Sequence, residues 1–293
     1  MVRRIISAFI AMALAIGVLY IDRKEIILIA IAFISAVVVY EILIATKYIR
    51  NRSVTVISLL FVLAVPFVLS YDIRFINTRY VSFIFIIGLF VVMLFNHKRV
   101  NFAEVALVAF VSLCVPFSLS CIVFIYDFVP ENYADLADLS NNPHRIFCIV
   151  YTLTITWISD SGAFFAGTFL GKHKMAPVVS PKKTWEGFAG GLVAAALFGF
   201  LLGKGYEWVT ILFTGDLTFK VDVLFLAVLA IPCAVLGVLG DLSASILKRE
   251  CEVKDFGDIM PGHGGVLDRF DSVLFVVPFA YLVFLQYFPI KAL

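Results

Sequence analysis

Nine apolar runs, separated by short polar segments, occupy most of this 293-residue chain. An apolar run of roughly 17–25 residues is long enough to cross a lipid bilayer as an α-helix. The pattern therefore predicts an all-α polytopic membrane protein with about nine transmembrane helices. The predicted helices cover residues 5–21, 26–46, 53–71, 81–95, 102–126, 146–171, 187–203, 221–240 and 272–289. The first begins like a signal peptide, but its apolar run continues to Tyr20, so we expect an uncleaved helix.

The composition supports this class of protein. Hydrophobic residues make up 62% of the chain and charged residues 15%, whereas a soluble domain carries about 25% charged residues. A soluble fold of this size could not bury so much apolar surface, and a disordered chain would be poor in hydrophobic residues. The net charge of +2 offers no argument for a nucleic-acid partner.

Lysines and arginines are unequally divided between the two sides that nine crossings would define. Fifteen of the 23 fall on the side that holds the N-terminus. Because positively charged loops stay in the cytoplasm, we expect the N-terminus to be cytoplasmic and the protein to lie in the cell (inner) membrane. The two most polar segments, residues 172–186 and 241–271, fall on this same side.

Residues 241–271 combine carboxylates with basic side chains. If the eighth helix continues past Asp241, then Asp241, Ser245 and Lys248 share one of its faces. Asp268 and Asp271 stand three residues apart where the ninth helix would begin, so their carboxylates would point the same way. Carboxylates can hold Mg²⁺ while nearby lysines and arginines neutralise phosphate oxygens, so the segment predicts a site for a magnesium-bound polyphosphate. A merely hydrated juxtamembrane loop is the alternative.

Two further segments could contribute to this site. Gly264 and Gly265 let the backbone approach a ligand closely and offer N–H groups to anionic oxygens. In residues 172–186, Ser180, Thr184 and the lysines between them could form a second clamp for phosphates, although lysines at a membrane surface often only attract anionic lipid.

Some polar and small residues lie inside the apolar runs. Asp160 is a functional candidate because a carboxylate within a transmembrane helix is costly, although it could instead form a helix-packing hydrogen bond to a Ser or Thr. We expect Glu41 and Glu104, near helix ends, to extend to the membrane surface. The glycines of the sixth and seventh helices, among them Gly167 and Gly190, predict close helix packing.

These motifs resemble the phosphatidate cytidylyltransferase family, also called CDP-diacylglycerol synthases. Residues 245–271 match its C-terminal pattern throughout, with Met260 where the family usually has Leu, Ile or Phe. Residues 180–187 are similar to a second family block, and residues 160–167 to a third, with Ser161 where Thr is common. The similarity covers about residues 146–289, whereas the first four helices match only in being apolar.

The resemblance implies a reaction of CTP with phosphatidic acid to give CDP-diacylglycerol and pyrophosphate, dependent on Mg²⁺, at the cytoplasmic leaflet of the bilayer. It also implies a homodimer, and leaves room for a second, possibly monovalent, cation. Residues 1–145 would then form a scaffold of five helices, and residues 146–293, with loops 172–186 and 241–271, the catalytic region.

The implied site residues fall into four groups. Asp241, Asp268 and Asp271 would bind metal, with Asp160 a weaker candidate. Lys182, Lys183, Lys248 and Arg249 would hold phosphates, His263 would orient or protonate a phosphate oxygen, and Lys254 and Arg269 would support the site.

Two other functions stay open: a CTP-dependent transferase or kinase for an isoprenoid lipid, and an ion-coupled transporter.

Overall fold

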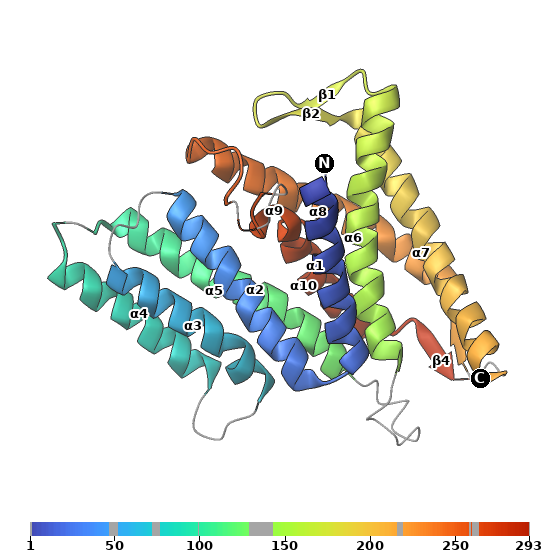
Figure 1. The fold of residues 1–293 in the computed structure, drawn as a ribbon, viewed down its shortest axis with the longest axis horizontal. Helices are drawn as coiled ribbons and strands as arrows, with labels where there is room; N and C mark the ends of the chain where they lie inside the picture. Colours follow the sequence, from blue (N-terminus) through green and yellow to red (C-terminus); the bar gives the residue numbers. More distant parts are fainter. Residues whose placement is uncertain are drawn as a thin grey trace. The chain divides into compact units, whose positions relative to one another are not determined.

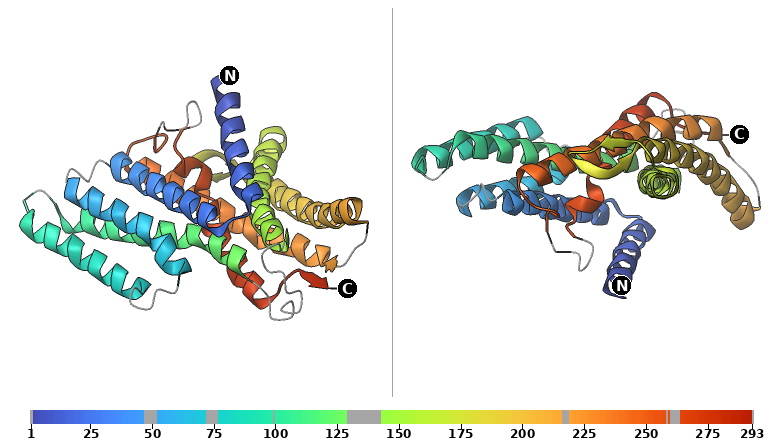
Figure 2. Two further views of the ribbon diagram at one scale, coloured as in Figure 1. Left: turned by 60° about the horizontal axis from the view of Figure 1, so that its bottom comes forward. Right: turned by 90° about the horizontal axis from the view of Figure 1, so that it is seen from above.

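A computed structural model describes residues 2–46, 52–71, 77–98, 100–128, 143–215, 219–257, 259 and 264–292. Most of these residues are helical (Figures 1 and 2). The chain forms two compact units. The first unit comprises residues 1–123 and 247–270, and the second comprises residues 124–246 and 271–293. Two long helices, α5 (Phe102–Asp127) and α8 (Val223–Glu250), pass from one unit into the other.

The first unit is built on helices that pack in chain order. Its other helices are α1 (Val2–Ile21), α2 (Lys24–Ala45), α3 (Arg52–Ser70), α4 (Thr78–Phe95) and the short α9 (Leu267–Phe270). Helices α2, α3 and α4 run side by side, and the rings of Phe61 and Phe85 stack between α3 and α4 with centroids 4.0 Å apart (Figure 1). Helix α9 packs against α2, so a segment from the C-terminal half of the sequence belongs to this unit.

The second unit is centred on the pair α6 (Pro143–Leu170) and α7 (Trp185–Thr214), with α8 and α10 (Val273–Gln286) beside them. Small residues let α6 and α7 approach closely. A Cβ atom added at Gly162 would lie 2.5 Å from the Cβ of Ala194, and one at Gly191 would lie 2.9 Å from the Ser159 carbonyl oxygen. The predicted close packing of these two helices is confirmed.

Two small antiparallel sheets depart from the purely helical prediction. Strands β1 (Lys174–Ala176) and β2 (Ser180–Thr184) form a hairpin at one end of α6 and α7 (Figure 1), and β3 (Phe219–Val221) pairs with β4 (Ile290–Ala292). A polar segment flanked by two apolar helices was expected to be a loop, but β-pairing satisfies its backbone N–H and C=O groups.

Each of the nine predicted runs coincides with a helix among the described residues. Seven of these helices, α2 to α8, are long and apolar enough to cross a membrane, whereas the apolar part of α1 (Phe9–Ile21) and the 14-residue α10 are shorter. Large apolar side chains such as Phe33, Leu60 and Phe164 are exposed, as expected for surfaces that face lipid. The protein is therefore a multi-pass membrane protein, and the count of nine crossings stays a prediction.

Helices α7 and α8 extend well beyond the apolar runs that predicted them, to Thr214 and Glu250. Hydropathy marks only the part of a helix that lies in hydrocarbon, while helical hydrogen bonding continues into polar sequence until a residue such as Gly215, with φ of 81°, ends it. Residues 247–270 belong to the same compact unit as the N-terminal helices, and the functional division at residue 145 stays a prediction.

We expect Gly162→Ala to lower stability by about 1–3 kcal/mol, because α6 and α7 must separate to accommodate the new methyl group. Gly205→Ala in α7 is the matched control, since a Cβ there meets nothing within 4 Å. Thermal unfolding of the detergent-purified protein measures both. A Gly162→Ala variant as stable as the Gly205→Ala control would contradict this account of the packing.

Candidate active site

Helix α8 carries three of the predicted site residues. It continues unbroken to Glu250, so Asp241, Ser245 and Lys248 lie on one helical face, as the sequence predicted. Ser245 is buried. Asp241 and Lys248 are two turns apart and take part in separate clusters, one in each unit.

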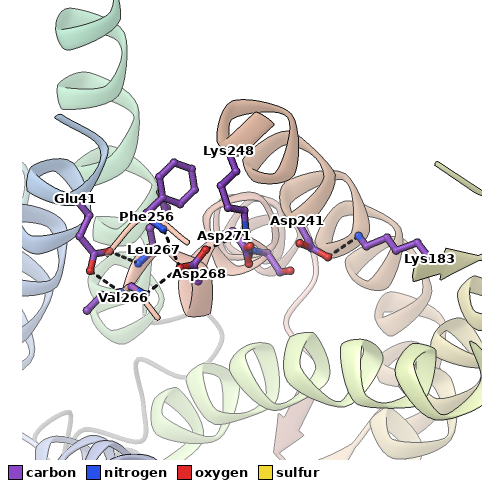
Figure 3. A network of polar contacts seen from close by, with 11 residues as sticks. Glu41, Lys183, Asp241, Lys248, Phe256, Val266, Leu267, Asp268 and Asp271 are labelled. Carbon is purple, nitrogen blue, oxygen red and sulfur yellow. Dashed lines mark hydrogen bonds and ion pairs between the residues drawn. The ribbon is translucent and has the colours of Figure 1, made fainter. Parts of the chain in front are cut away.

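The first unit contains the Asp268 cluster, which consists of Glu41, Lys248, Phe256, Gly265, Val266, Leu267 and Asp268 (Figure 3). Lys248 Nζ lies 2.9 Å from Asp268 Oδ1. The other carboxylate oxygen, Oδ2, accepts hydrogen bonds from the backbone N–H groups of Gly265 at 2.9 Å and Phe256 at 3.2 Å. A carboxylate offers about four acceptor positions, and the described residues supply three donors to Asp268.

This ion pair is largely removed from solvent. The Lys248 and Asp268 side chains are 15% and 7% exposed, and the Lys248 ammonium also lies 5.6 Å from the centre of the Phe256 ring. A buried charge must be paired and hydrogen-bonded to be tolerated. The pair therefore fixes a carboxylate and an ammonium group together before any ligand binds.

Glu41 also belongs to this cluster. The sequence did not predict a role for Glu41 in the site. We expected it to extend to the membrane surface, and this is wrong: Glu41 is 2% exposed. Its Oε1 and Oε2 atoms accept hydrogen bonds from the backbone N–H groups of Val266 at 2.9 Å and Leu267 at 2.8 Å (Figure 3). The available signal was a carboxylate inside an apolar run, where an ionisable residue marks a functional candidate.

Glycines make room for these contacts. A Cβ at Gly265 would lie 2.6 Å from Glu41 Oε2, and a Cβ at Gly257 would lie 2.8 Å from Glu41 Oε1. Gly264 has φ of 87°, in the left-handed region that glycine adopts without strain. The glycines are thus needed where the backbone turns and approaches Glu41.

The second unit contains the Asp241 cluster, which consists of Asp160, Lys183, Asp241 and Ser272. Lys183 reaches from β2 to α8, where its Nζ lies 2.6 Å from Asp241 Oδ2 and 3.4 Å from the Val238 carbonyl oxygen (Figure 3). The negative charge of Asp160 repels that of Asp241, and Lys183 offsets this repulsion. Two carboxylates and one lysine leave an excess of negative charge, which suits a bound cation.

Asp160 belongs to α6, and Asp271 directly precedes Ser272 at the start of α10. The Ser272 hydroxyl donates to Asp160 Oδ2 at 3.3 Å, which is the helix-packing bond that the sequence left open. Asp271 is 8% exposed and its Oδ1 accepts from the Ser272 N–H at 2.7 Å. Helix α8 approaches at Gly240, where a Cβ would lie 2.5 Å from the Asp271 carbonyl oxygen.

The β1–β2 hairpin is anchored at its base. The Thr184 side chain accepts from the Gly187 N–H at 3.1 Å and so caps α7. Glu186 accepts from the Lys172 and His173 N–H groups, and its Oε1 lies 2.6 Å from His173 Nδ1. Lys182 is exposed and Ser180 is half-buried. The hairpin therefore directs Lys183 to Asp241 and leaves Lys182 open to solvent.

Three further predicted site residues lie at exposed positions, namely Arg249, Lys254 and Arg269. His263 lies outside the described residues, so its role stays a prediction.

Each cluster, taken by itself, fits Mg²⁺ only if water and substrate supply most of the ligands. Among the described residues, no three Asp, Glu, His or Cys side chains converge as a complete metal site. Mg²⁺ is commonly held by one or two carboxylates, with water and substrate phosphates as the remaining ligands. Asp160 and Asp241 in one cluster, and Asp268 in the other, supply carboxylates of this kind.

Comparison with known proteins agrees with this chemistry. Residues 2–288 match the cytidylyltransferase family, so the chain belongs to that family. The chain is 46% identical over 135 residues to a protein of Bacillus subtilis, and 41% identical over 136 residues to one of Haemophilus influenzae. Both relatives are named phosphatidate cytidylyltransferase. The matched segments cover 46% of this chain in each case, and 46% and 45% of the two relatives, so the chain spans about half the length of the relatives that it matches.

We expect Lys248→Met to destabilise the protein by about 3 kcal/mol, because Asp268 would keep a buried charge without its partner. The double variant Lys248→Met/Asp268→Asn should recover part of this loss, since the neutral amide needs no counter-charge. Lys254→Met, at an exposed position, is the control and should change stability little. Thermal unfolding in detergent measures all three, and a double variant no more stable than Lys248→Met would argue against the pair.

Proposed function

We propose that the protein is a phosphatidate cytidylyltransferase, which transfers CMP from CTP to phosphatidic acid and releases pyrophosphate. The proposal rests chiefly on the Asp268 cluster, where a buried carboxylate, an ammonium group and backbone N–H groups meet. Such a mixture suits a magnesium-bound polyphosphate. Membership of the cytidylyltransferase family and the names of the relatives support the same reaction.

The reaction needs no nucleophile from the protein. An oxygen of the phosphatidate phosphate attacks the α-phosphorus of CTP and forms a new P–O bond. The bond from that phosphorus to the bridging oxygen breaks, and pyrophosphate leaves with the electron pair. Catalysis of phosphoryl transfer then consists of positioning and charge neutralisation, which lysines, arginines and carboxylates supply.

We assign Lys248, Arg249, Lys182 and Lys183 to phosphate binding. Lys248 and Lys183 are each held against a carboxylate, at 2.9 and 2.6 Å, so their ammonium groups are oriented in advance. Such pre-organised charge costs no rearrangement during the reaction. The assignment also includes His263, to orient or protonate a phosphate oxygen.

Neighbouring groups would support the same substrates. Lys254 and Arg269 add positive charge at exposed positions. The hydroxyls of Ser180, Thr184 and Ser245, together with the backbone of Gly264 and Gly265, complete the proposed substrate-binding set.

Asp241, Asp268 and Asp271 are the proposed ligands of Mg²⁺, and Asp160 is a candidate ligand for a second cation, either monovalent or divalent. When bound, the metal would neutralise negative charge on the phosphate oxygens of CTP. The protein carboxylates hold it in place, and their own positions are fixed by the contacts of Asp268 with Lys248 and of Asp241 with Lys183.

We further propose that the site faces the cytoplasm from the inner membrane and that the enzyme is a homodimer in phospholipid biosynthesis. The excess of lysine and arginine on one side of the predicted crossings supports this orientation. The dimer rests on the family resemblance.

Purified protein supplied with CTP labelled at its α-phosphate and with phosphatidate is expected to form labelled lipid only when a divalent cation is present. The measurement is the label recovered in the lipid phase, with and without a chelator. No labelled lipid under any condition would refute the proposal.

A parallel reaction with an isoprenoid phosphate separates the two lipid classes. If CMP transfer to the isoprenoid phosphate is faster than transfer to phosphatidate, the isoprenoid is the substrate. If neither labelled lipid forms, an ion-coupled transporter becomes the function to test. The reaction without lipid is the blank, because hydrolysis of CTP alone yields no labelled lipid.

Asp268→Asn and Asp271→Asn are each expected to lower turnover by more than about 100-fold, because loss of an outer-shell group alone costs about 10–100-fold. Glu252→Gln, an exposed carboxylate in the same segment, is the matched control and should retain turnover. Thermal unfolding checks that the variants stay folded. Near-normal rates in both aspartate variants would refute the metal assignment.

A further inference from the structure

Glu41 is a buried charge for which the proposed reaction has no direct use. It comes from α2, in the part of the sequence that we expected to be a scaffold, and its hydrogen-bond partners are 225 and 226 residues away. A buried carboxylate costs several kcal/mol unless hydrogen bonds compensate it. Packing alone would be served better by an apolar side chain, so the charge requires another explanation.

The bonds of Glu41 control the backbone directly before Asp268. One oxygen receives the N–H of Val266 and the other the N–H of Leu267, so the carboxylate fixes two successive peptide planes. The Asp268 side chain then folds back to accept from Gly265 and Phe256. Any rotation of residues 266–267 would therefore move the Asp268 carboxylate away from Lys248.

Glycines 257 and 265 point to the same role. Both lie against the Glu41 carboxylate so closely that a methyl group at either position would displace it. The negative charges of Glu41 and Asp268 also repel each other. The repulsion between the two carboxylates is unfavourable, yet the hydrogen bonds of Glu41 hold residues 265–267 in place.

We infer that Glu41 is a positioning residue of the active site, which orients the Asp268 carboxylate by fixing the backbone of residues 265–267. The inference rests on the proposed function, because the group it positions is one that we assign to catalysis. It makes an N-terminal helix part of the catalytic machinery. A displacement of only about 1 Å at a catalytic group can cost 100-fold in rate.

The test compares Glu41→Gln with a control variant that should lose a similar amount of folding stability. Gln keeps the size of Glu, but its NH₂ group is a donor and cannot accept the second backbone N–H. Leu28→Ala is the control, since Leu28 is fully buried in the same helix, and 13 residues separate it from Glu41. Gly257→Ala acts on the carboxylate from the opposite direction and should reproduce the effect of Glu41→Gln.

Two measurements are made on the purified 293-residue chain in detergent. Hydrogen exchange of the amides in residues 264–268 should be faster in Glu41→Gln and unchanged in Leu28→Ala. The kcat for CDP-diacylglycerol formation should fall by about 10–100-fold in Glu41→Gln, with the KM for CTP nearly unchanged. Leu28→Ala should lower the unfolding temperature and keep its kcat at a temperature where it stays folded.

Wild-type exchange rates in Glu41→Gln would overturn the inference, as would a kcat no lower than that of Leu28→Ala. If the wild-type protein forms no labelled lipid from phosphatidate, the proposed function fails instead. The exchange comparison still shows in that case whether Glu41 holds this segment, so the two failures are distinguishable.

Discussion

The contact between the Glu41 carboxylate and the backbone of Val266 and Leu267 is the interaction on which the Asp268 cluster depends. A charged group at 2% exposure is stable only where donors surround it, and two backbone N–H groups meet this need. Because the donors belong to the turn before Asp268, the same two hydrogen bonds stabilise the Glu41 charge and fix the position of Asp268. Helix α2 thus contributes a buried carboxylate to the Asp268 cluster.

The remaining charges follow the same physical rule in both units. Lys248 pairs with Asp268 and Lys183 pairs with Asp241, each within 3 Å, so that no carboxylate in these pairs is left without a counter-charge. A low-dielectric surrounding strengthens such pairs and penalises unpaired groups. For phosphoryl transfer this arrangement is useful, since the catalytic requirement is charge held at defined positions.

Close helix packing supplies the rigidity that such positioning needs. Small residues bring α6 and α7 together, and Gly240 brings α8 against the backbone of Asp271. The hairpin β1–β2 is tied to the start of α7 through Thr184 and Glu186, so Lys183 extends from an ordered strand. In a bilayer, where lipid replaces water around the helices, van der Waals contact of this kind takes the place of hydrophobic burial.

The sequence by itself determined the class of protein, the positions of the helices, the shared face of Asp241, Ser245 and Lys248, and the close packing of α6 with α7. These follow from hydropathy, helical periodicity and small-residue spacing, which are local properties. Only the tertiary structure decided that Glu41 holds the turn before Asp268, that residues 247–270 pack with the N-terminal helices, and that residues 174–184 form a hairpin. The physical reason is that the partners of Glu41 are backbone N–H groups more than 200 residues away, and such donors are present at nearly every position of a chain.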